Sequence, residues 1–270
     1  MASSQARSLR YRAVVRIAVV IPALDEEDAI EAAVASARGS RERLPAPEPL
    51  STEPRAARDG ASPGALAEGP VDSSTVECIV VDGGSRDRTA ARARAVAARV
   101  IAAPRGRSHQ LEAGWRASAA DAVLFLHADT RLPVGWEAAV AGALADPEVV
   151  GGAFALRFDA RSLGLRVVEW GAWLRAALFG LPYGDQALFA RRAALEAIGG
   201  IPAAPILEDL DLVRALRRRG RLARIPLAVT TSARRYQRRG VVRTWWRNAL
   251  ALAAWRLGID RERVAAWYAR

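Results

Sequence analysis

Short apolar runs alternate with amphipathic segments along the first half of this chain. The runs at 17–21 and 123–126 contain no polar residue, and a third at 76–81 is broken only by Glu77, which is typical of buried strands. After the first run, apolar residues recur at helical spacing at Ala29, Ile30, Ala33, Val34 and Ala37. With a short run at 100–102, strand and helix alternate four times, which predicts a mostly parallel, right-handed, Rossmann-like α/β sheet flanked by helices.

Two further helices are predicted between these strands. One follows the turn after the 76–81 run and reaches about Arg99. Ser85 and Asp87 are its expected caps, because short polar side chains accept hydrogen bonds from the free N–H groups at a helix start. The other opens in the polar segment 105–109 and runs through Ala120.

The pattern changes after Asp129. The segment 150–158 is longer, and its alternating Phe154, Leu156 and Phe158 are typical of an antiparallel or edge strand. One or two short strands are expected within 221–231. Helical spacing predicts further helices at 135–145, 163–179, 192–198, 207–219, 242–257 and 261–269. The last two are amphipathic and rich in tryptophan and arginine.

The segment 39–72 interrupts the alternation of strands and helices. It contains six prolines, several glycines and almost no large apolar side chains. Such a segment cannot bury enough surface to offset its ordering entropy, so it is predicted to be a disordered loop insertion. We therefore expect one domain over 1–241, which includes this insertion, and a C-terminal helical appendage over 242–270.

The charge of the chain restricts its partners only broadly. The 270 residues carry a formal net charge of +11 without any lysine, so arginine supplies all the positive side chains. Phosphate-bearing small molecules, anionic lipid and nucleic acid all suit such a surface, but the sequence has no recognisable nucleic-acid module. Nucleic acid is therefore not an expected partner.

The cysteine content and the N-terminal segment bear on the compartment. Cys78 is the single cysteine, which excludes an intrachain disulfide and favours a place in the core. The first apolar run, ended by Pro22, is too short for a signal peptide or a spanning helix. The sequence predicts a cytoplasmic protein with, at most, peripheral contact with the inner face of the membrane.

Charged side chains gather where predicted strands end and helices begin. Each of them alone can be explained as a helix cap or a solvated charge, and Asp129 could simply cap the turn after its strand. The carboxyl ends of parallel strands meet at the edge where open α/β sheets bind ligands. Together, these groups could bind a ribose or base, a diphosphate, a metal ion and an acceptor proton. They are Asp25 to Glu27, Asp82, Arg107, Asp129, and Glu208 with Asp209.

Four segments resemble, in this order, the successive signatures of family 2 glycosyltransferases with the GT-A fold. They are VVIPALDEE, IVVDGGSRDRT, RGRSHQLEAG leading into VLFLHADT, and ILEDLDLVRALRRRG. The resemblance covers about 16–231 except for 39–72, and HADT with PYGDQALF and TTSARRY is similar to a bacterial branch of that family. It implies an inverting enzyme that moves a sugar from a nucleotide-diphosphate sugar, with UDP-sugars favoured, to a hydroxyl acceptor.

The resemblance implies roles for individual residues in donor binding. Pro22, Leu24 and Glu26 match positions that line the nucleoside pocket of such enzymes. Asp82 matches the position that binds the base, and Arg107 matches a basic side chain that steadies the nucleotide.

The resemblance also implies a metal site and a general base. Asp129 matches the last acid of the Asp-x-Asp motif, so Mg²⁺ or Mn²⁺ bridging the donor diphosphate is expected. Asp209, with Glu208 beside it, matches the base that deprotonates the acceptor. Two positions depart from the pattern: His127 replaces the first acid of the metal motif, and Gly83 replaces the second acid of the commoner Asp-Asp pair. The metal is therefore expected to be held loosely, with diphosphate oxygens completing its ligands.

Two other sites have both a functional and a plainer explanation. Asp185 and Gln186 in the PYGDQ turn are candidate contacts to the donor sugar or the acceptor, although turns containing proline, glycine and aspartate are common without function. His109 opens a helix near Arg107 and is expected to be an ordinary surface or capping residue.

The arginine- and tryptophan-rich segment 234–255 allows three interpretations. It could lie on a membrane surface, close to a lipid-linked acceptor. Arg235 or Arg238 could instead clamp the diphosphate of the substrate. In the third interpretation the tryptophans pack on the domain and the arginines are solvated.

Two other function classes stay open from the sequence. A nucleotidyl or phosphoryl transferase could use a similar sheet, but it would normally show a phosphate loop such as GxxxxGK, which this sequence lacks. A non-catalytic basic protein that binds nucleotide or membrane is the other, and the gathering of acids at predicted strand ends argues against it.

Overall fold

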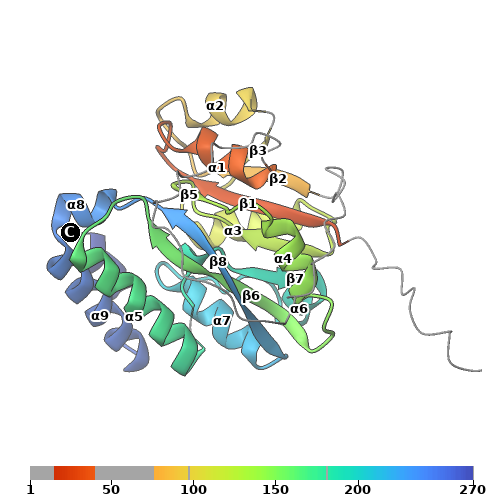
Figure 1. The fold of residues 1–270 in the computed structure, drawn as a ribbon. Helices are drawn as coiled ribbons and strands as arrows, with labels where there is room; N and C mark the ends of the chain where they lie inside the picture. Colours follow the sequence, from red (N-terminus) through yellow and green to blue (C-terminus); the bar gives the residue numbers. More distant parts are fainter. Residues whose placement is uncertain (1–14, 40–75, 97, 181, 270) are drawn as a thin grey trace, which may run out of the picture.

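The fold is a single twisted sheet with helices on both faces, seen in a computed structural model that describes residues 15–39, 76–96, 98–180 and 182–269 (Figure 1). The sheet has eight strands in the order β3-β2-β1-β4-β7-β6-β8-β5. The predicted insertion at 39–72 lies outside the described residues apart from Gly39.

The first half of the sheet is parallel, as predicted. Strand β1 pairs in parallel with β2 on one side and with β4 on the other, and β2 pairs in parallel with β3. Its strands and the helices between them are β1 (Ile17–Ala23), α1 (Ile30–Ala37), β2 (Val76–Asp82), α2 (Thr89–Ala95), β3 (Arg99–Ala102), α3 (Arg107–Arg116) and β4 (Ala122–Phe125).

Three local predictions in this half were wrong. Strand β1 continues through Pro22, because β4 pairs only as far as Val20 and the missing N–H of the proline is not needed there. Helix α2 ends at Ala95, since Arg99 already begins β3, and α3 ends at Arg116, four residues before the predicted end at Ala120.

The second half of the sheet mixes strand directions. It contains β5 (Thr130–Arg131), β6 (Val149–Phe158), β7 (Phe189–Arg191) and β8 (Arg221–Thr231). The prediction of an antiparallel or edge strand for β6 was only partly right: β6 lies inside the sheet, antiparallel to β7 but parallel to β8. The exposure of β6 does not alternate, since residues 151–154 are all buried, and β7 pairs only with Gly151 and Gly152, so the rest of β6 has β8 alone as a neighbour.

The remaining helices follow the predicted positions closely, apart from one that was missed. They are α4 (Trp136–Ala143), α5 (Leu163–Phe179), the 3₁₀ turn η2 (Gly184–Gln186), α6 (Arg192–Ala197), α7 (Glu208–Arg217), α8 (Arg234–Arg239), α9 (Val241–Arg256) and α10 (Arg261–Ala269). Helix α8 was not predicted, because its six residues, RRYQRR, carry no apolar period.

Two apolar cores fill the space between the sheet and its helices. One packs α1 and α4 on one face of the sheet, and it includes Ile30 and Trp136. The other packs α3, α6 and α7 on the opposite face around Trp115 and Leu212. The single cysteine, Cys78, is buried in the first core, and burial raises the pKa of its thiol to about 12.

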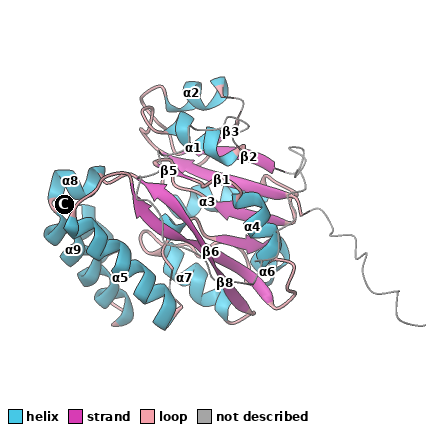
Figure 2. Ribbon diagram, viewed as in Figure 1, coloured by secondary structure: helices cyan, strands magenta, loops and turns pink. Residues whose placement is uncertain are grey.

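Helices α5, α8, α9 and α10 gather at one end of the molecule (Figures 1 and 2). Helix α9 contacts α5, α8 and α10, while Trp255 of α9 and Arg261 of α10 both bind Asp211 of α7. The division into residues 1–241 and 242–270 stays a prediction. Among the helices that the structure describes, none combines the length and the apolar character needed to cross a bilayer.

Candidate functional site

The loops that follow β1 and β2 are tied together by hydrogen bonds, and we call residues 24–28 and 82–89 the loop network. The backbone N–H of Asp25 donates to Ser85 Oγ (3.1 Å), and Ser85 Oγ donates to Asp82 Oδ1 (2.5 Å). Ser85 was predicted to cap α2, but it does not do so. It fixes the orientation of the Asp82 carboxylate at the carboxyl end of β2.

Glu26 belongs to the same network and also faces the C-terminal half of the chain. Its N–H donates to Thr89 Oγ1 (2.8 Å), and its two carboxylate oxygens accept from Arg234 (3.0 and 2.8 Å). Burial raises the pKa of Glu26, and the hydrogen bond from Arg234 acts against this shift. Pro22 and Leu24 lie partly buried on the same segment.

The structure gives a reason for the departure at Gly83. A side chain there would meet the amide of Gln110, whose Nε2 would lie 2.9 Å from an added Cβ. That amide donates to the carbonyl oxygens of Ala23 and Val81, both at 2.8 Å, and so joins the ends of β1 and β2. Gln110 therefore occupies the space that an acid at position 83 would need, a role that no motif in the sequence indicates.

An arginine and two acids meet where α3 and α7 begin. Arg107 Nε lies 3.1 Å from Glu208 Oε1, and the Glu208 side chain is only 6% exposed. Burial raises the pKa of Glu208, while Arg107 acts in the opposite direction. Asp209 accepts a hydrogen bond from the N–H of Gly184 through Oδ2 (2.7 Å) and stays partly accessible.

Helix α8 brings two arginines to the end of β4. Burial raises the pKa of Asp129, and Arg234, Arg235 and Arg107 oppose that shift. Burial lowers the pKa of His127 well below its ordinary value, and Arg107 and Arg235 lower it further. The His127 imidazole is therefore neutral at physiological pH.

The PYGDQ turn separates the two residues predicted from it. Gln186 is almost fully buried and bonded within the protein: its Nε2 donates to the Phe154 carbonyl (3.0 Å), and its Oε1 accepts from the N–H of Tyr183 (3.1 Å). Asp185 has a buried Oδ1 without a hydrogen-bond partner among the described residues, and burial raises its pKa. Among the nearby charges Arg175 has the largest effect and lowers that pKa, and Asp209, Arg107 and Arg235 also influence it, which places Asp185 in the same group as the α7 acids.

The residues present offer few ligands for a metal ion. Within the described part of the chain, no three histidine, cysteine or acidic side chains come together in a way that could hold one. Asp129 supplies one carboxylate, and His127 Nε2 is buried without a hydrogen-bond partner. A neutral imidazole and one carboxylate make an incomplete set, which oxygens of a bound diphosphate could complete.

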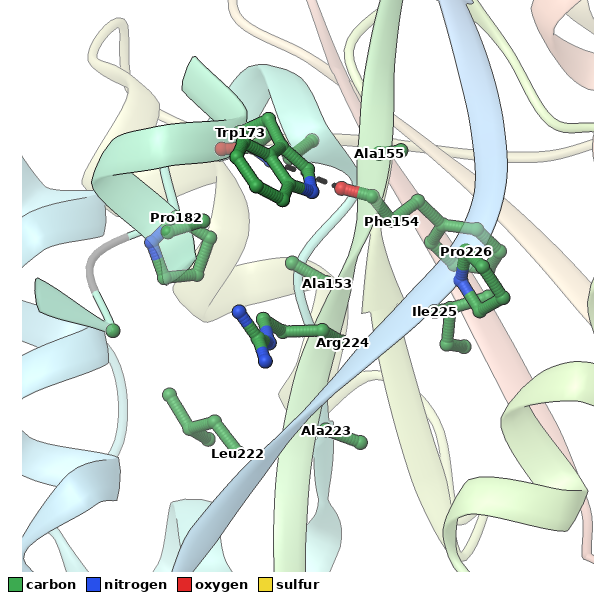
Figure 3. Close-up of a pocket in the computed structure, with 13 residues that line it drawn as sticks. Ala153, Phe154, Ala155, Trp173, Pro182, Leu222, Ala223, Arg224, Ile225 and Pro226 are labelled. Atoms are coloured by element: carbon green, nitrogen blue, oxygen red, sulfur yellow. Dashed lines mark hydrogen bonds between the residues drawn. The ribbon is translucent and has the colours of Figure 1, made fainter. Parts of the chain in front are cut away.

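A separate cavity of about 500 Å³ opens between α5, β6 and β8 (Figure 3). Small side chains such as Ala153 form much of its wall, Trp173 lies at its rim, and Arg224 extends into it. Gln186 lines this cavity, whereas Gly184 of the same turn binds Asp209. The turn therefore stands between the cavity and the acids of α7.

Most of the residues predicted from the sequence form one connected group at the carboxyl ends of the parallel strands, and we call the position of this group the crevice. Contacts or electrostatic interactions link Glu26, Asp129, Asp185, Glu208, Asp209 and Arg107. Asp82 lies in the adjoining loop network, and Gln186 faces away from these groups. The two arginines considered as a diphosphate clamp are both exposed, and Arg235 is the one that contributes to the pKa of Asp129, His127 and Asp185.

Comparison with protein families gives one match over part of this chain. The family model described as glycosyl transferase family 2 matches residues 64–185. This range includes the loop network after β2, Arg107, Asp129 and Asp185. No curated protein sequence matches the chain.

Solved structures share the fold over most of the chain. A Mycobacterium tuberculosis glucosyl-3-phosphoglycerate synthase in complex with Mn²⁺ and UDP-glucose is 25% identical, with a TM-score of 0.57 over 92% of this chain and 81% of that one. The same enzyme with Mn²⁺, UDP-glucose and phosphoglyceric acid is also 25% identical, with a TM-score of 0.58 over 92% and 82%. Its complex with Mg²⁺ and UDP is 24% identical, with a TM-score of 0.56 and the same coverage. The predicted GT-A architecture is thereby confirmed.

Proposed function

We propose that this chain, which carries a family 2 glycosyltransferase domain, transfers a sugar from a UDP-sugar to an acceptor hydroxyl with inversion at the anomeric carbon. The observation that carries the proposal is the meeting of Arg107, Asp129 and the α7 acids in one crevice at the carboxyl ends of the parallel strands. The similar structures contain UDP or UDP-glucose with Mn²⁺ or Mg²⁺, which supports the same class of donor and metal here.

Arg107 and Arg235 are the groups that we assign to the donor diphosphate. Both influence the pKa of Asp129, so their charges lie near the carboxylate at which a metal would bind. A divalent cation, when bound, supplies positive charge that offsets the charge on the departing diphosphate. Arg107 adds to that effect in a fixed orientation, because its ion pair with the buried Glu208 holds the guanidinium in place.

Asp129 and His127 are the residues that we assign to the metal. The carboxylate is the stronger ligand for Mg²⁺ or Mn²⁺, and the unpartnered His127 Nε2 is available as a nitrogen ligand. Binding a cation would also remove the cost of burying Asp129 among apolar groups, a cost that its raised pKa reports.

Asp209 is the residue that we assign as general base. Glu208 is paired with Arg107 and acts as a positioning residue. Asp209 is partly accessible, so its carboxylate is free to take the proton of the acceptor hydroxyl. In the reaction the acceptor oxygen bonds to the anomeric carbon while the bond from that carbon to the diphosphate oxygen breaks. The hydroxyl proton passes to the Asp209 carboxylate, and the electron pair leaves with the nucleoside diphosphate.

For the acceptor, two observations point in different directions. Phosphoglyceric acid is bound in one of the similar structures, which supports a small anionic hydroxy compound. The exposed apolar side chains of α5 and α9, such as Leu163 and Trp246, favour instead an acceptor that is carried by a lipid. UDP release from UDP-glucose with each kind of acceptor separates the two.

The general-base assignment is tested by Asp209→Asn. Asp146→Asn is the control, because Asp146 forms an exposed ion pair with Arg221. We expect Asp209→Asn to lower turnover by about 10²–10⁴-fold, because this is the usual contribution of a general base. Binding of UDP should stay within about twofold of wild type, since an uncharged isostere leaves the nucleotide contacts in place. A fully active Asp209→Asn enzyme would rule out this role.

A further inference from the structure

Helix α5 presents apolar side chains to solvent along its whole length. Ser162 caps its start, and its buried face includes Leu165 and Ala172. The opposite face carries Leu163, Val167, Trp170 and Leu178, which are between 60% and 88% exposed. A surface helix normally presents polar residues to water. The exposed apolar face of α5 is therefore unusual for a domain surrounded only by water.

Helix α9 repeats the arrangement beside it. Its inward face includes Thr244, Ala251 and Trp255, whereas Val242, Trp246, Leu250 and Leu257 lie on the outward face and are 52–77% exposed. The two helices begin side by side, since a Cβ on Gly164 would lie 3.1 Å from Val241, and they run together at one end of the molecule (Figure 1). We call these eight exposed residues the apolar stripes of α5 and α9.

The charge near the stripe of α9 has a single sign, whereas α5 carries Glu169 in an ion pair with Arg166. From 233 to 259 the sequence contains seven arginines and neither aspartate nor glutamate. Arg243 and Arg256 lie on the flanks of the outward stripe of α9, where a long side chain can reach past the apolar residues. An anionic surface is thus the electrostatic complement of these helices.

We propose that the apolar stripes of α5 and α9 dock on the surface of an anionic lipid bilayer. Neither helix is long and apolar enough to cross the membrane, so both lie in the interface with their apolar stripes among the upper acyl chains. Exposed Trp170, Trp245 and Trp246 suit the headgroup level, and the flanking arginines meet the lipid phosphates. A protein partner with a matching apolar groove explains the stripes but not the absence of acidic residues from 233–259.

The docking surface adjoins the crevice through α8. This short helix carries Arg234 and Arg235 into the crevice and packs against α9 on its other side. Docking would therefore hold the crevice at the edge of the bilayer, whatever its acceptor. The inference does not depend on the proposed reaction, because it rests on helices that contribute no group to it apart from this connection.

Flotation with lipid vesicles tests the inference on the full chain. Vesicles of phosphatidylcholine and phosphatidylglycerol in equal parts should carry the protein, and vesicles of phosphatidylcholine alone should carry much less. Trp246→Glu or Val167→Glu should abolish flotation, because a carboxylate would have to enter the apolar layer. Replacing Arg243 and Arg256 together by glutamine should weaken binding about 30-fold at low salt, as expected for the loss of two arginines near anionic lipid.

Val134→Glu is the matched control, because Val134 is 78% exposed on the loop before α4, away from the stripes. It should float as the wild type does, and all variants should keep the wild-type melting temperature and circular dichroism. Failure of the wild type to bind either vesicle would overturn the inference. So would a stable dimer in light scattering that Trp246→Glu converts to a monomer, since the stripes would then be covered by a second copy.

Discussion

Two groups of acids lie at the same edge of the sheet, and they differ in burial and in their hydrogen bonds. Those of the loop network, Asp25, Asp82 and Asp87, each accept hydrogen bonds from neighbouring backbone or hydroxyl groups. Desolvation acts to raise the pKa of Asp87, but hydrogen bonds from Thr89 and nearby backbone outweigh it and lower the pKa. The carboxyl groups of Asp25, Asp82 and Asp87 therefore have hydrogen-bond partners within the protein, and these bonds tie the two loops together.

The acids of the second group, Asp129, Asp185 and Glu208, are buried, and burial raises their pKa despite the arginines nearby. Asp185 Oδ1 and His127 Nε2 find no hydrogen-bond partner within the described residues. Raised pKa values of this origin gather at functional sites, since a bound ligand or cation can supply what the protein leaves out. The comparison therefore separates acids whose hydrogen bonds hold the loops in place from buried acids that a bound substrate or cation would stabilise.

The largest effect that we expect is on donor binding by Arg235 of α8. Arg235→Gln should weaken binding of UDP about tenfold or more, because a hydrogen bond to a charged group is lost. Arg238→Gln removes the same charge from the same helix, at a position that is also exposed but does not contribute to the pKa of His127, and should change the affinity less than about twofold. Isothermal titration calorimetry measures both, and equal losses would mean that the arginines act only through long-range attraction.

A smaller effect, on the melting temperature, is expected from Asp185→Asn. The sign of this effect distinguishes the second group of acids from the first. The folded-state pKa of Asp185 is raised above its ordinary value of 3.8, so the folded protein binds a proton that the unfolded chain releases. The stability that protonated Asp185 contributes is thus fully present below pH 3.8. It is lost as the pH rises through the folded-state pKa, and the protein stays less stable at neutral pH. The neutral amide should raise the melting temperature by several degrees at pH 7 and by less in acid.

Scanning calorimetry of Asp185→Asn and wild type at several pH values measures this difference. A lower melting temperature for Asp185→Asn at neutral pH would show that the carboxylate has a stabilising partner. Asp185 would then belong with the loop network rather than with the acids that await a ligand.

The smallest effect is expected from Ser85→Ala in the loop network. The change removes the acceptor for the Asp25 N–H and the donor to Asp82, which should cost about 1 kcal/mol and lower the melting temperature by roughly 2–4 °C. Ser36→Ala is the control: Ser36 Oγ also makes two hydrogen bonds, to Ala33 and Leu132. Both variants should lose similar stability, but only Ser85→Ala should also weaken UDP binding. A Ser85→Ala variant with unchanged affinity would remove the loop network from the donor site.

The sequence predicted the parallel half of the sheet well because each strand there is a continuous apolar run. It predicted the second half less well, since the direction of β6 depends on β7 and β8, which lie far along the chain. Apolar periodicity could not predict α8. This helix nevertheless brings Arg234 into contact with Glu26, which lies 208 positions away in the sequence.

The candidate site was predicted only as far as motifs reach. The motifs located Asp129, Arg107 and Asp209, and the structure places them near one another. They gave no sign of Gln110, because an amide in the middle of a helix has no distinguishing neighbours until the ends of β1 and β2 close around it. They also placed Gln186 with Asp185, and only the backbone of η2 shows that the two side chains point apart.

The central claim is that the crevice holds a nucleoside diphosphate sugar with a cation at Asp129. The most direct measurement is the melting temperature of the wild type and of Asp129→Ala with UDP or UDP-glucose, each with and without Mn²⁺, because a ligand that binds only the folded state raises it by mass action. We predict a rise for the wild type that Mn²⁺ enlarges, and for Asp129→Ala a smaller rise that Mn²⁺ does not change. A wild type that shifts with neither nucleotide, or an Asp129→Ala variant that keeps the full Mn²⁺ effect, would contradict the account.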